Sequence, residues 1–308
     1  MTLQLPSVQI KPIHKIFPII EKVSQRKRNR IGIGILRDSK QVQDGLKKAS
    51  KQADVVVVGK NKISGFETIA LGEVPETDYA KALIKLLEEG RVDAIVRAQL
   101  KYGEFEKTFK AKYGYASDNG MLCLMQDIFG RQWFYTSADP FDKSEVPEHK
   151  IDLIEKSVHY MGLYGIKAKI GILAGDFTYD RGENAWIDQT IHNAEYVVKV
   201  LSGEGYDIKN YAHLINEAVD NCNLIIFING SQGNFVYRAL YQLGGALEMG
   251  AHVFVPEPYI EASRYHSKYD THIIAANAEV NLLRAGANKV YEPKSDPKKK
   301  FSQHRVII

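Results

Sequence analysis

Short apolar runs of strand length alternate with helical segments along most of this chain, and this alternation restricts the fold more than any other feature. The clearest strand-length runs are Ile31–Leu36, Asp54–Val58, Val92–Val96, Lys169–Ala174 and Leu224–Ile228. The clearest helical segments are Thr77–Glu89, Ile151–Tyr164 and Asn184–Leu201. Apolar strands that alternate with helices form parallel sheets with helices on both faces. The sequence therefore predicts an α/β fold of two doubly wound domains with largely parallel sheets.

The same patterns predict the remaining elements. Further strands are expected at Met121–Met125, Gln132–Tyr135 and His252–Val255. Further helices are expected at Ile10–Lys27, Gln41–Gln52, Gly103–Lys112, Tyr211–Val219, Asn234–Leu247 and Asp270–Arg284. A polar stretch with two prolines, Asp139–Pro147, interrupts the alternation, and we place a domain boundary there. A length of 308 residues suits two domains.

The charge balance excludes one broad class of partner. Lys and Arg total 41 and Asp and Glu 37, so the formal net charge is only +4. This lacks the basic character that non-specific nucleic-acid binding requires, and the lysine-rich Lys294–Lys300 is interpreted as a solvated tail. No apolar run reaches the roughly 18 residues of a membrane helix, and Met1–Lys15 lacks a secretory signal. We expect neither a nucleic-acid nor a membrane partner.

Cysteine and histidine spacing gives no sign of a bound cofactor. The two cysteines, Cys123 and Cys222, lie outside any C-x-x-C pair, which excludes a disulfide scaffold and favours a reducing, cytoplasmic location. The nine histidines show no metal-ligand spacing, so no metal is expected. Gly32 and Gly34 begin a G-x-G-x-x-G pattern, but Arg37 stands at the third glycine. No bound cofactor is predicted.

Ligands of open parallel sheets bind beyond the carboxyl ends of the strands. Arg97 and Gln99 directly follow the strand Val92–Val96, where a guanidinium can meet an anion; the alternative is a surface loop with solvated cations. The loop Gly175–Asn184 is longer than most connections after a strand and contains Arg181. It is either a binding loop or a surface loop whose charges pair with one another.

Two more segments carry candidate site residues. Asn229-Gly230-Ser231-Gln232-Gly233-Asn234 follows a strand, and Asn234 is a plausible N-cap, so the turn resembles a phosphate cradle. An ordinary strand-to-helix turn has a similar composition. Ser263 and Arg264 precede Asp270 at the expected start of a helix. These residue types can stabilise charge and move a proton, but Ser and Asp are also common helix caps.

The two segments together resemble the signature of the phosphate acetyl/butyryltransferase superfamily. In that family a strand ends in a turn with glycine and asparagine, as in the run Asn223–Ala251, and the next helix ends in glycines. A Ser-Arg pair follows, with an Asp six residues later, as in Ser263-Arg264 and Asp270. Val92–Arg97 and Gly175–Asn184 are also similar to the archaeal methanogenesis marker protein 4 group, provisionally named methyltransferase subunit X.

The resemblance implies a fold and a set of roles. The expected architecture, like that of isocitrate and isopropylmalate dehydrogenases, has one domain of residues 1–138 plus 259–308, a second of 139–258 and a cleft between them. Arg264 would stabilise developing charge, Asp270 would activate a coenzyme A thiol, and Ser263 would steady that thiol. The residues expected to bind substrate or phosphate are Arg97, Gln99, Gly175, Arg181, Asn229, Gly230, Gly233 and Asn234. A homodimer acting on a small anionic substrate is expected, with a coenzyme A-like or phosphorylated co-substrate.

Departures from the family pattern leave three hypotheses open. Ile228-Asn229 replaces a Pro-Asp pair, which removes a carboxylate, and Arg97-Ala98-Gln99 replaces Ser-Gly-Ala, which adds a cation. The first hypothesis is a transferase that moves an acyl or related group between phosphate and a coenzyme A-type thiol. The second is a ligand-binding accessory protein without turnover. The third, which rests on the name of the marker group alone, is a methyltransferase subunit of one-carbon metabolism.

Overall fold

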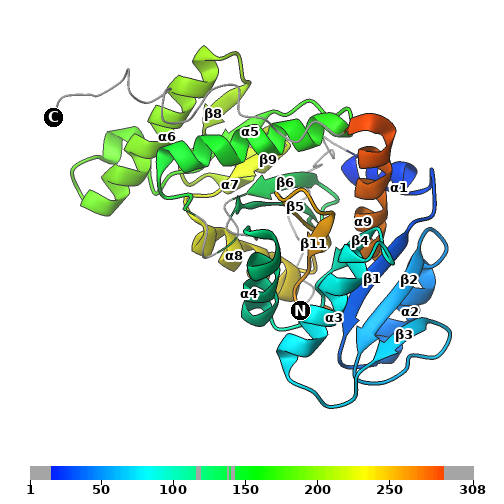
Figure 1. Ribbon diagram of the computed structural model, residues 1–308. Helices are drawn as coiled ribbons and strands as arrows, with labels where there is room; N and C mark the ends of the chain where they lie inside the picture. Colours follow the sequence, from blue (N-terminus) through cyan, green and yellow to red (C-terminus); the bar gives the residue numbers. More distant parts are fainter. Residues whose placement is uncertain (1–14, 116–118, 137–138, 140–142, 288–308) are drawn as a thin grey trace, which may run out of the picture.

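A computed structural model describes residues 15–115, 119–136, 139 and 143–287 (Figure 1). Its strands are β1 (Arg30–Ile35), β2 (Asp54–Gly59), β3 (Glu67–Ala70), β4 (Ala94–Val96), β5 (Met121–Gln126), β6 (Gln132–Thr136), β7 (Ile170–Ile172), β8 (Ile208–Asn210), β9 (Leu224–Ile226), β10 (Leu247–Val253) and β11 (Tyr259–Glu261). The strands form one sheet in the order β3-β2-β1-β4-β11-β10-β5-β6-β9-β7-β8. The predicted α/β class is confirmed.

The sheet has two parallel arms joined by an antiparallel centre. The first arm comprises β3, β2, β1, β4 and β11, and the second comprises β6, β9, β7 and β8. Between them, β10 pairs antiparallel with both β11 and β5, and β5 pairs antiparallel with β6. We expected two separate sheets, whereas these central strands continue the hydrogen bonding from one arm to the other. The division of the chain into two domains stays a prediction.

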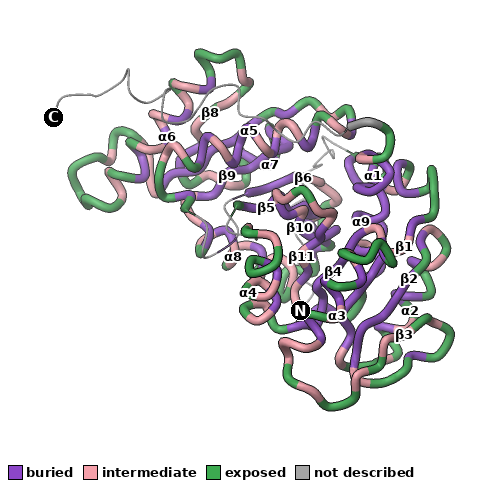
Figure 2. Tube along the Cα trace, in the orientation of Figure 1, coloured by how far each residue is buried: buried purple, intermediate pink, exposed green. Residues whose placement is uncertain are grey.

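The main helices are α1 (Ile16–Ser24), α2 (Lys40–Ala49), α3 (Glu76–Glu88), α4 (Tyr102–Tyr113), α5 (Pro147–Leu163), α6 (Ala185–Gly203), α7 (Ile215–Asn221), α8 (Gly230–Arg238) and α9 (Asp270–Leu282). Helix α9 is buried along almost its whole length and packs against α1 (Figure 2). Its two inward asparagines, Asn277 and Asn281, both donate to the carbonyls of Ser24 and Lys27. These bonds satisfy backbone carbonyls at the end of α1 and just beyond it, and they give the buried asparagine amides partners in place of water.

Several boundaries differ from the predicted ones. The short strands β3, β8 and β11 were not predicted, because strands of three or four residues carry little periodicity. The expected helix Tyr211–Val219 is shortened to α7. The expected helix Asn234–Leu247 begins instead at Gly230 and ends, through a π-helical turn, at Leu243. Residues 10–14 of the expected first helix and the lysine-rich tail lie outside the described residues.

Caps and glycines explain the shifted boundaries. The side chain of Asn229 accepts a hydrogen bond from the Gln232 amide at 2.9 Å, which makes Asn229, not Asn234, the N-cap of α8. Gly245 has a φ of 71°, in the left-handed region, so the chain turns there and enters β10. No helix in the described part of the chain has the length and apolar character to cross a membrane.

Candidate functional site

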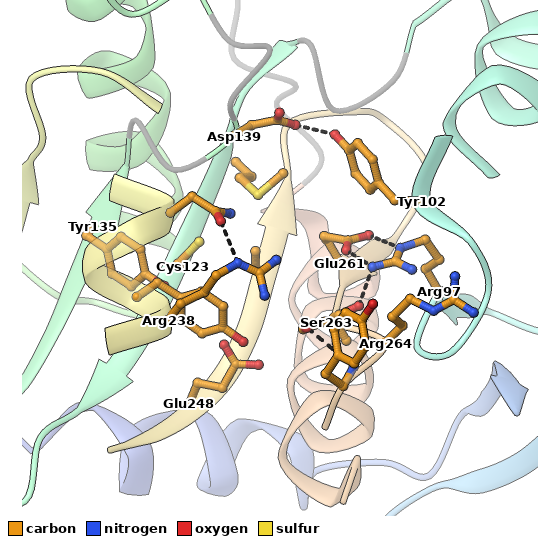
Figure 3. A pocket seen from close by; sticks show the side chains of 16 residues that line it. Arg97, Tyr102, Cys123, Tyr135, Asp139, Arg238, Glu248, Glu261, Ser263 and Arg264 are labelled. Atoms are coloured by element: carbon orange, nitrogen blue, oxygen red, sulfur yellow. Dashed lines mark hydrogen bonds and ion pairs between the residues drawn. The ribbon is translucent and has the colours of Figure 1, made fainter. Parts of the chain in front are cut away.

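A cavity of about 270 Å³ lies at the centre of the sheet, where the two arms meet (Figure 3). Strands β5, β6 and β10 supply its apolar floor, and helix α8 and the segments after β4, β6 and β11 supply its polar walls. Its lining residues are Arg97, Tyr102, Met121, Cys123, Tyr135, Asp139, Asn234, Tyr237, Arg238, Glu248, Ala251, Glu261, Ala262, Ser263, Arg264 and Tyr265. A concave apolar site with a few convergent polar groups is the usual form of a small-molecule binding site.

Two arginines from different arms of the sheet line this cavity. Arg238 extends from the last turn of α8 toward the middle of the cavity, and its Nε donates to the Asn234 side-chain oxygen at 2.8 Å (Figure 3). Arg264 follows β11 on the other side, and its nearest carboxylate oxygen, on Glu76, lies 3.7 Å away. Among the described residues no carboxylate forms an ion pair with Arg238. Arg238 is therefore available to an anionic ligand, and Arg264 is held only by its long ion pair with Glu76.

A third arginine of the cavity wall, Arg97, is already fully bonded. Its Nε donates to a Glu261 carboxylate oxygen at 2.6 Å, and a second nitrogen donates to the other oxygen of the same group. The remaining donors reach the carbonyls of Ala98, Leu100 and Ala262. The side chain is only 3% exposed; burial lowers its pKa, but the Glu261 carboxylate more than offsets this and the pKa is raised. Arg97 therefore braces the loops after β4 and β11.

The other predicted residues of this segment do not all reach the cavity. Ser263 and Arg264 line it. Asp270, the predicted base, does not: it begins α9, and its carboxylate lies 2.6 Å from the ammonium of Lys48 on α2. Gln99 is buried away from the cavity, where its side-chain oxygen accepts from the amides of Leu36 and Arg37.

The segment predicted to bind phosphate reaches the cavity with the second turn of α8, not with its first turn. Asn229, Gly230 and Gly233 form the first turn of α8 and do not line the cavity, and the Asn229 amide donates to Glu145 at 3.0 Å. Asn234 does line it, from the second turn of the helix. The structure therefore brings the α8 side chains, not the helix N-terminus, to the site.

The long loop after β7 lies away from the cavity. Arg181 pairs with Glu195 at 2.5 Å, and both side chains are about 40% exposed, so the loop charges pair locally. The Gly175 amide donates to the Thr190 hydroxyl at 2.8 Å. A Cβ at Gly175 would lie 2.9 Å from that oxygen, which explains the glycine by close packing of the loop on α6.

Several lining residues were missed by the sequence analysis. Cys123, Tyr135 and Glu248 lie on strands, with no motif around them. Arg238 lies in a helix that the sequence did predict, but no motif distinguishes it from the other residues of that helix. Burial raises the pKa of the Cys123 thiol, which stays protonated and is a poor nucleophile. Burial also raises the pKa of Tyr237, with a further contribution from the Glu248 carboxylate.

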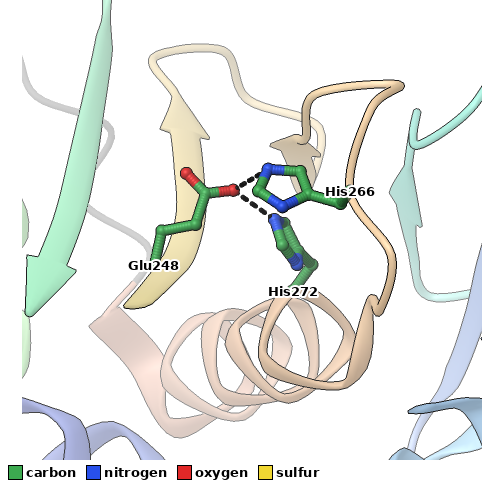
Figure 4. Close-up of side chains that lie close together, drawn as sticks. All are labelled: Glu248, His266 and His272. Atoms are coloured by element: carbon green, nitrogen blue, oxygen red, sulfur yellow. Dashed lines mark hydrogen bonds and ion pairs between the residues drawn. The ribbon is translucent and has the colours of Figure 1, made fainter. Parts of the chain in front are cut away.

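One cluster at the cavity edge has a composition that could hold a metal. Glu248 of β10 faces His266, from the segment after β11, and His272, in the first turn of α9 (Figure 4). All three side chains are buried. Burial lowers the pKa of His272, although hydrogen bonding to Glu248 acts in the opposite direction. Spacing failed to predict this group because its three members come from three different elements.

Comparisons with known proteins assign the family. No family model matches the chain. A Methanosarcina barkeri protein provisionally named methyltransferase mtx subunit X is 27% identical over 269 residues, which cover 86% of this chain and 98% of that protein. A Methanocaldococcus jannaschii protein, named as an uncharacterized methyltransferase, is 31% identical over 176 residues, which cover 54% of this chain and 70% of that protein. The chain belongs to the mtx subunit X family.

Solved structures of phosphotransacylases share the fold of this mtx subunit X family member. The branched-chain phosphotransacylase from Enterococcus faecalis matches with a TM-score of 0.60 and 14% identity, over 83% of this chain and 99% of that chain. The phosphotransacetylase from Streptococcus pyogenes also has a TM-score of 0.60, with 12% identity, over 89% of this chain and 100% of that chain. At these identities the similarity is one of fold, and it confirms the fold implied by the resemblance.

Proposed function

We propose that the cavity binds a small anionic substrate, and that the protein transfers an acyl group between phosphate and a coenzyme A-type thiol. The observation that carries the proposal is that two arginines without a close carboxylate, Arg238 and Arg264, line one cavity from different arms of the sheet. Guanidinium groups hold phosphate and carboxylate oxygens through two parallel hydrogen bonds. The fold shared with phosphotransacylases supports the same reaction class.

Two of the three carboxylates that line the cavity, Glu261 and Glu248, are bonded to partners other than Arg238 and Arg264. Glu261 pairs with Arg97, and Glu248 bonds His266 and His272. Asp139 accepts a hydrogen bond from the Tyr102 hydroxyl. Arg238 of α8 and Arg264 of the segment after β11 have no such close carboxylate. The cavity therefore favours an anion.

The proposed reaction is balanced with an acyl phosphate and a thiol. The thiol sulfur attacks the acyl carbon, the bond between that carbon and the bridging oxygen breaks, and phosphate leaves. The thiol proton ends on the released phosphate. Arg264 stabilises the charge that develops on the carbonyl oxygen, Arg238 holds the phosphoryl oxygens, and Ser263 orients the attacking group. Asp270 has no part in this scheme because its carboxylate lies off the cavity, beside Lys48.

The test is a coupled assay of thiol consumption with coenzyme A and a panel of acyl phosphates. Arg264→Ala and Arg238→Ala are each expected to lower turnover by about 10²-fold, the typical loss when one charge-stabilising donor is removed. Arg181→Ala is the matched control, since it removes a guanidinium that pairs with Glu195 outside the cavity. Turnover that is unchanged in both cavity variants would refute the assignment.

The names of the relatives support a second candidate, a methyltransferase subunit that binds a ligand without acyl transfer. In that case the cavity still binds phosphate, and Arg238→Ala still weakens the binding, but no acyl phosphate is turned over. Isothermal titration with inorganic phosphate, alongside the coupled assay, separates the two candidates. Co-purification with a corrinoid protein would favour methyl transfer.

A homodimer in the cytoplasm belongs to the same proposal. Exposed apolar side chains gather at the β5–β6 turn and the entry to β10, where a Cβ at Gly245 would lie 3.4 Å from Ile128. Ile128 is 59% exposed, Leu243 87% and Leu247 54%. Apolar patches of this kind mark protein interfaces. Light scattering should give a dimer mass for the wild type and a monomer mass for Leu243→Asp; a dimeric variant would refute this interface.

The proposed cytoplasmic location rests on the cysteines. Two buried free cysteines fit a reducing compartment.

A further inference from the structure

Three buried side chains at the edge of the cavity converge on one point. Glu248, His266 and His272 have one ligand atom each, and these three atoms lie within 4.8 Å of one another. One oxygen of Glu248 faces the Nε2 atoms of both histidines, at 2.6 Å from that of His272 (Figure 4). The side chains of both histidines are 1% exposed and that of Glu248 is 8% exposed. Solvent therefore contributes little to their bonding.

We propose that Glu248, His266 and His272 form a binding site for a divalent transition-metal ion, with an open coordination position toward the cavity. Two imidazoles and a carboxylate are a ligand set that suits zinc and ferrous iron. Catalytic zinc sites have three protein ligands and leave a fourth position for water or substrate. Glu248 itself lines the cavity, so the fourth position of an ion at this point faces the space that a ligand would occupy.

The present geometry is close to what an ion requires. A tetrahedral zinc ion with bonds of about 2.0–2.2 Å holds its ligand atoms about 3.3 Å apart. Glu248 Oε1 and His272 Nε2 lie 2.6 Å apart, so they need to separate by only about 0.7 Å, a change that side-chain rotation can provide. The three ligands come from a strand, a loop and a helix start, so one ion would tie together β10, the segment after β11 and α9.

The hydrogen bonds around the cluster suit metal ligation. His266 Nε2 lies 2.8 Å from the Tyr237 hydroxyl as well as near Glu248, so two partners compete for one nitrogen. A neutral imidazole nitrogen carries either one proton or one lone pair, and serves one such partner well. When an ion takes the lone pair, Glu248 becomes a fellow ligand and Tyr237 is left beside the open position. The His272 Nδ1 atom lies 3.4 Å from the Thr271 hydroxyl, an outer partner that orients the ring.

The site adds a chemical capacity to the cavity. An ion there would polarise an oxygen of a bound anionic ligand, as a Lewis acid. This inference does not depend on the arginine assignment, because Arg238 and Arg264 are not among the three ligands. Loss of metal binding and loss of anion binding can therefore be measured separately.

The test is isothermal titration of Zn²⁺ into the chelator-treated, full-length protein. We expect one Zn²⁺ per chain, and binding weakened at least ~100-fold in Glu248→Gln and in His272→Gln, since even residues that only orient a ligand are worth 10–100-fold. His252→Gln is the matched control. His252 is a partly buried histidine on the same strand, 2.9 Å from the Glu279 carboxylate, and it belongs to no cluster of three ligands among the described residues.

Each outcome decides the proposal. The proposal would be overturned if the wild type bound no Zn²⁺, or if binding were unchanged in both ligand variants. The cluster would then be only a buried carboxylate that is hydrogen-bonded to two histidines. If the variants do not fold, the visible absorption of Co²⁺ added to the wild type decides. An intense spectrum of low coordination number supports the site, and a spectrum equal to that of aqueous Co²⁺ overturns it. Arg264→Ala should bind Zn²⁺ as the wild type does.

Discussion

Replacing Arg97 by methionine tests whether this arginine braces the fold or binds the substrate. The side chain is 3% exposed, and all of its hydrogen bonds go to Glu261 and to three backbone carbonyls. Methionine has a similar length and apolar stem but no donor. The variant leaves the Glu261 carboxylate, whose side chain is 11% exposed, without its cation.

The expected loss is large. Removing one partner of a buried ion pair costs about 3–5 kcal/mol, because the remaining charge stays buried without compensation. For a chain of this size that corresponds to a fall in Tm on the order of 10 °C. Adding Glu261→Gln should restore part of the stability, because the uncompensated charge is then removed as well. The coupling free energy of the two substitutions should exceed about 1 kcal/mol.

Urea unfolding, followed by circular dichroism, measures the free energies of all four members of this cycle. Arg181→Met is the surface control and should cost less than about 1 kcal/mol, since its pair with Glu195 is exposed. If Arg97→Met lost less than about 1 kcal/mol, or if the two substitutions were additive, the bracing role would be refuted. A variant of normal stability with weakened phosphate binding would instead show that Arg97 contacts the ligand.

Three further predictions follow from the structure. In the coupled assay, Asp270→Asn should lower turnover by far less than the ~10²-fold loss expected for a general base. Hydrogen bonding to Asp270 raises the pKa of Lys48. The stability that this ion pair adds is therefore present below about pH 10.4 and is lost as the pH rises through the raised pKa. Burial raises the pKa of Glu195, but hydrogen bonds from Arg181 and Thr178 outweigh this effect, and the pKa is lowered. The stability cost of Arg181→Ala should therefore be present above about pH 4.3, and it should vanish in acid unfolding experiments as the pH falls through the lowered pKa. Gly250→Ala should cost more than about 1 kcal/mol in thermal unfolding, because Gly250 has a φ of 85° and its new Cβ would lie 2.6 Å from a neighbouring side chain; an unchanged Tm would contradict this.

Much of the fold could be predicted because the long elements carry strong periodic signals. The buried strands β1 and β2 are continuous apolar runs, and helices such as α3 and α6 have apolar residues at helical spacing. The shorter strand β11 has only three residues, too few for a period to be visible. The joining of two arms into one sheet depends on the pairing of β10 with β5, which lies across more than a hundred residues of sequence.

The site was only partly predictable. Ser263 and Arg264 could be found because they form a compact motif directly after a strand. Arg238 and Glu248 could not, because each is an ordinary residue of its element and gains its role from what lies opposite. Arg97 was identified as a site residue, but the sequence could not show that Glu261, 164 residues later, takes up its charge.

The sequence by itself determined the α/β class, the order of the long helices and strands, and the segments that reach the cavity after β4 and β11. Periodicity and local motifs encode these features within short windows of the chain. Only the tertiary structure decided which charges are paired and which are available. It places Asp270 beside Lys48, brings Arg264 and Arg238 to the lining of one cavity, and gathers Glu248 with two histidines. The physical reason is that burial and pairing are properties of the space between elements, and that space is defined only when the arms of the sheet have packed.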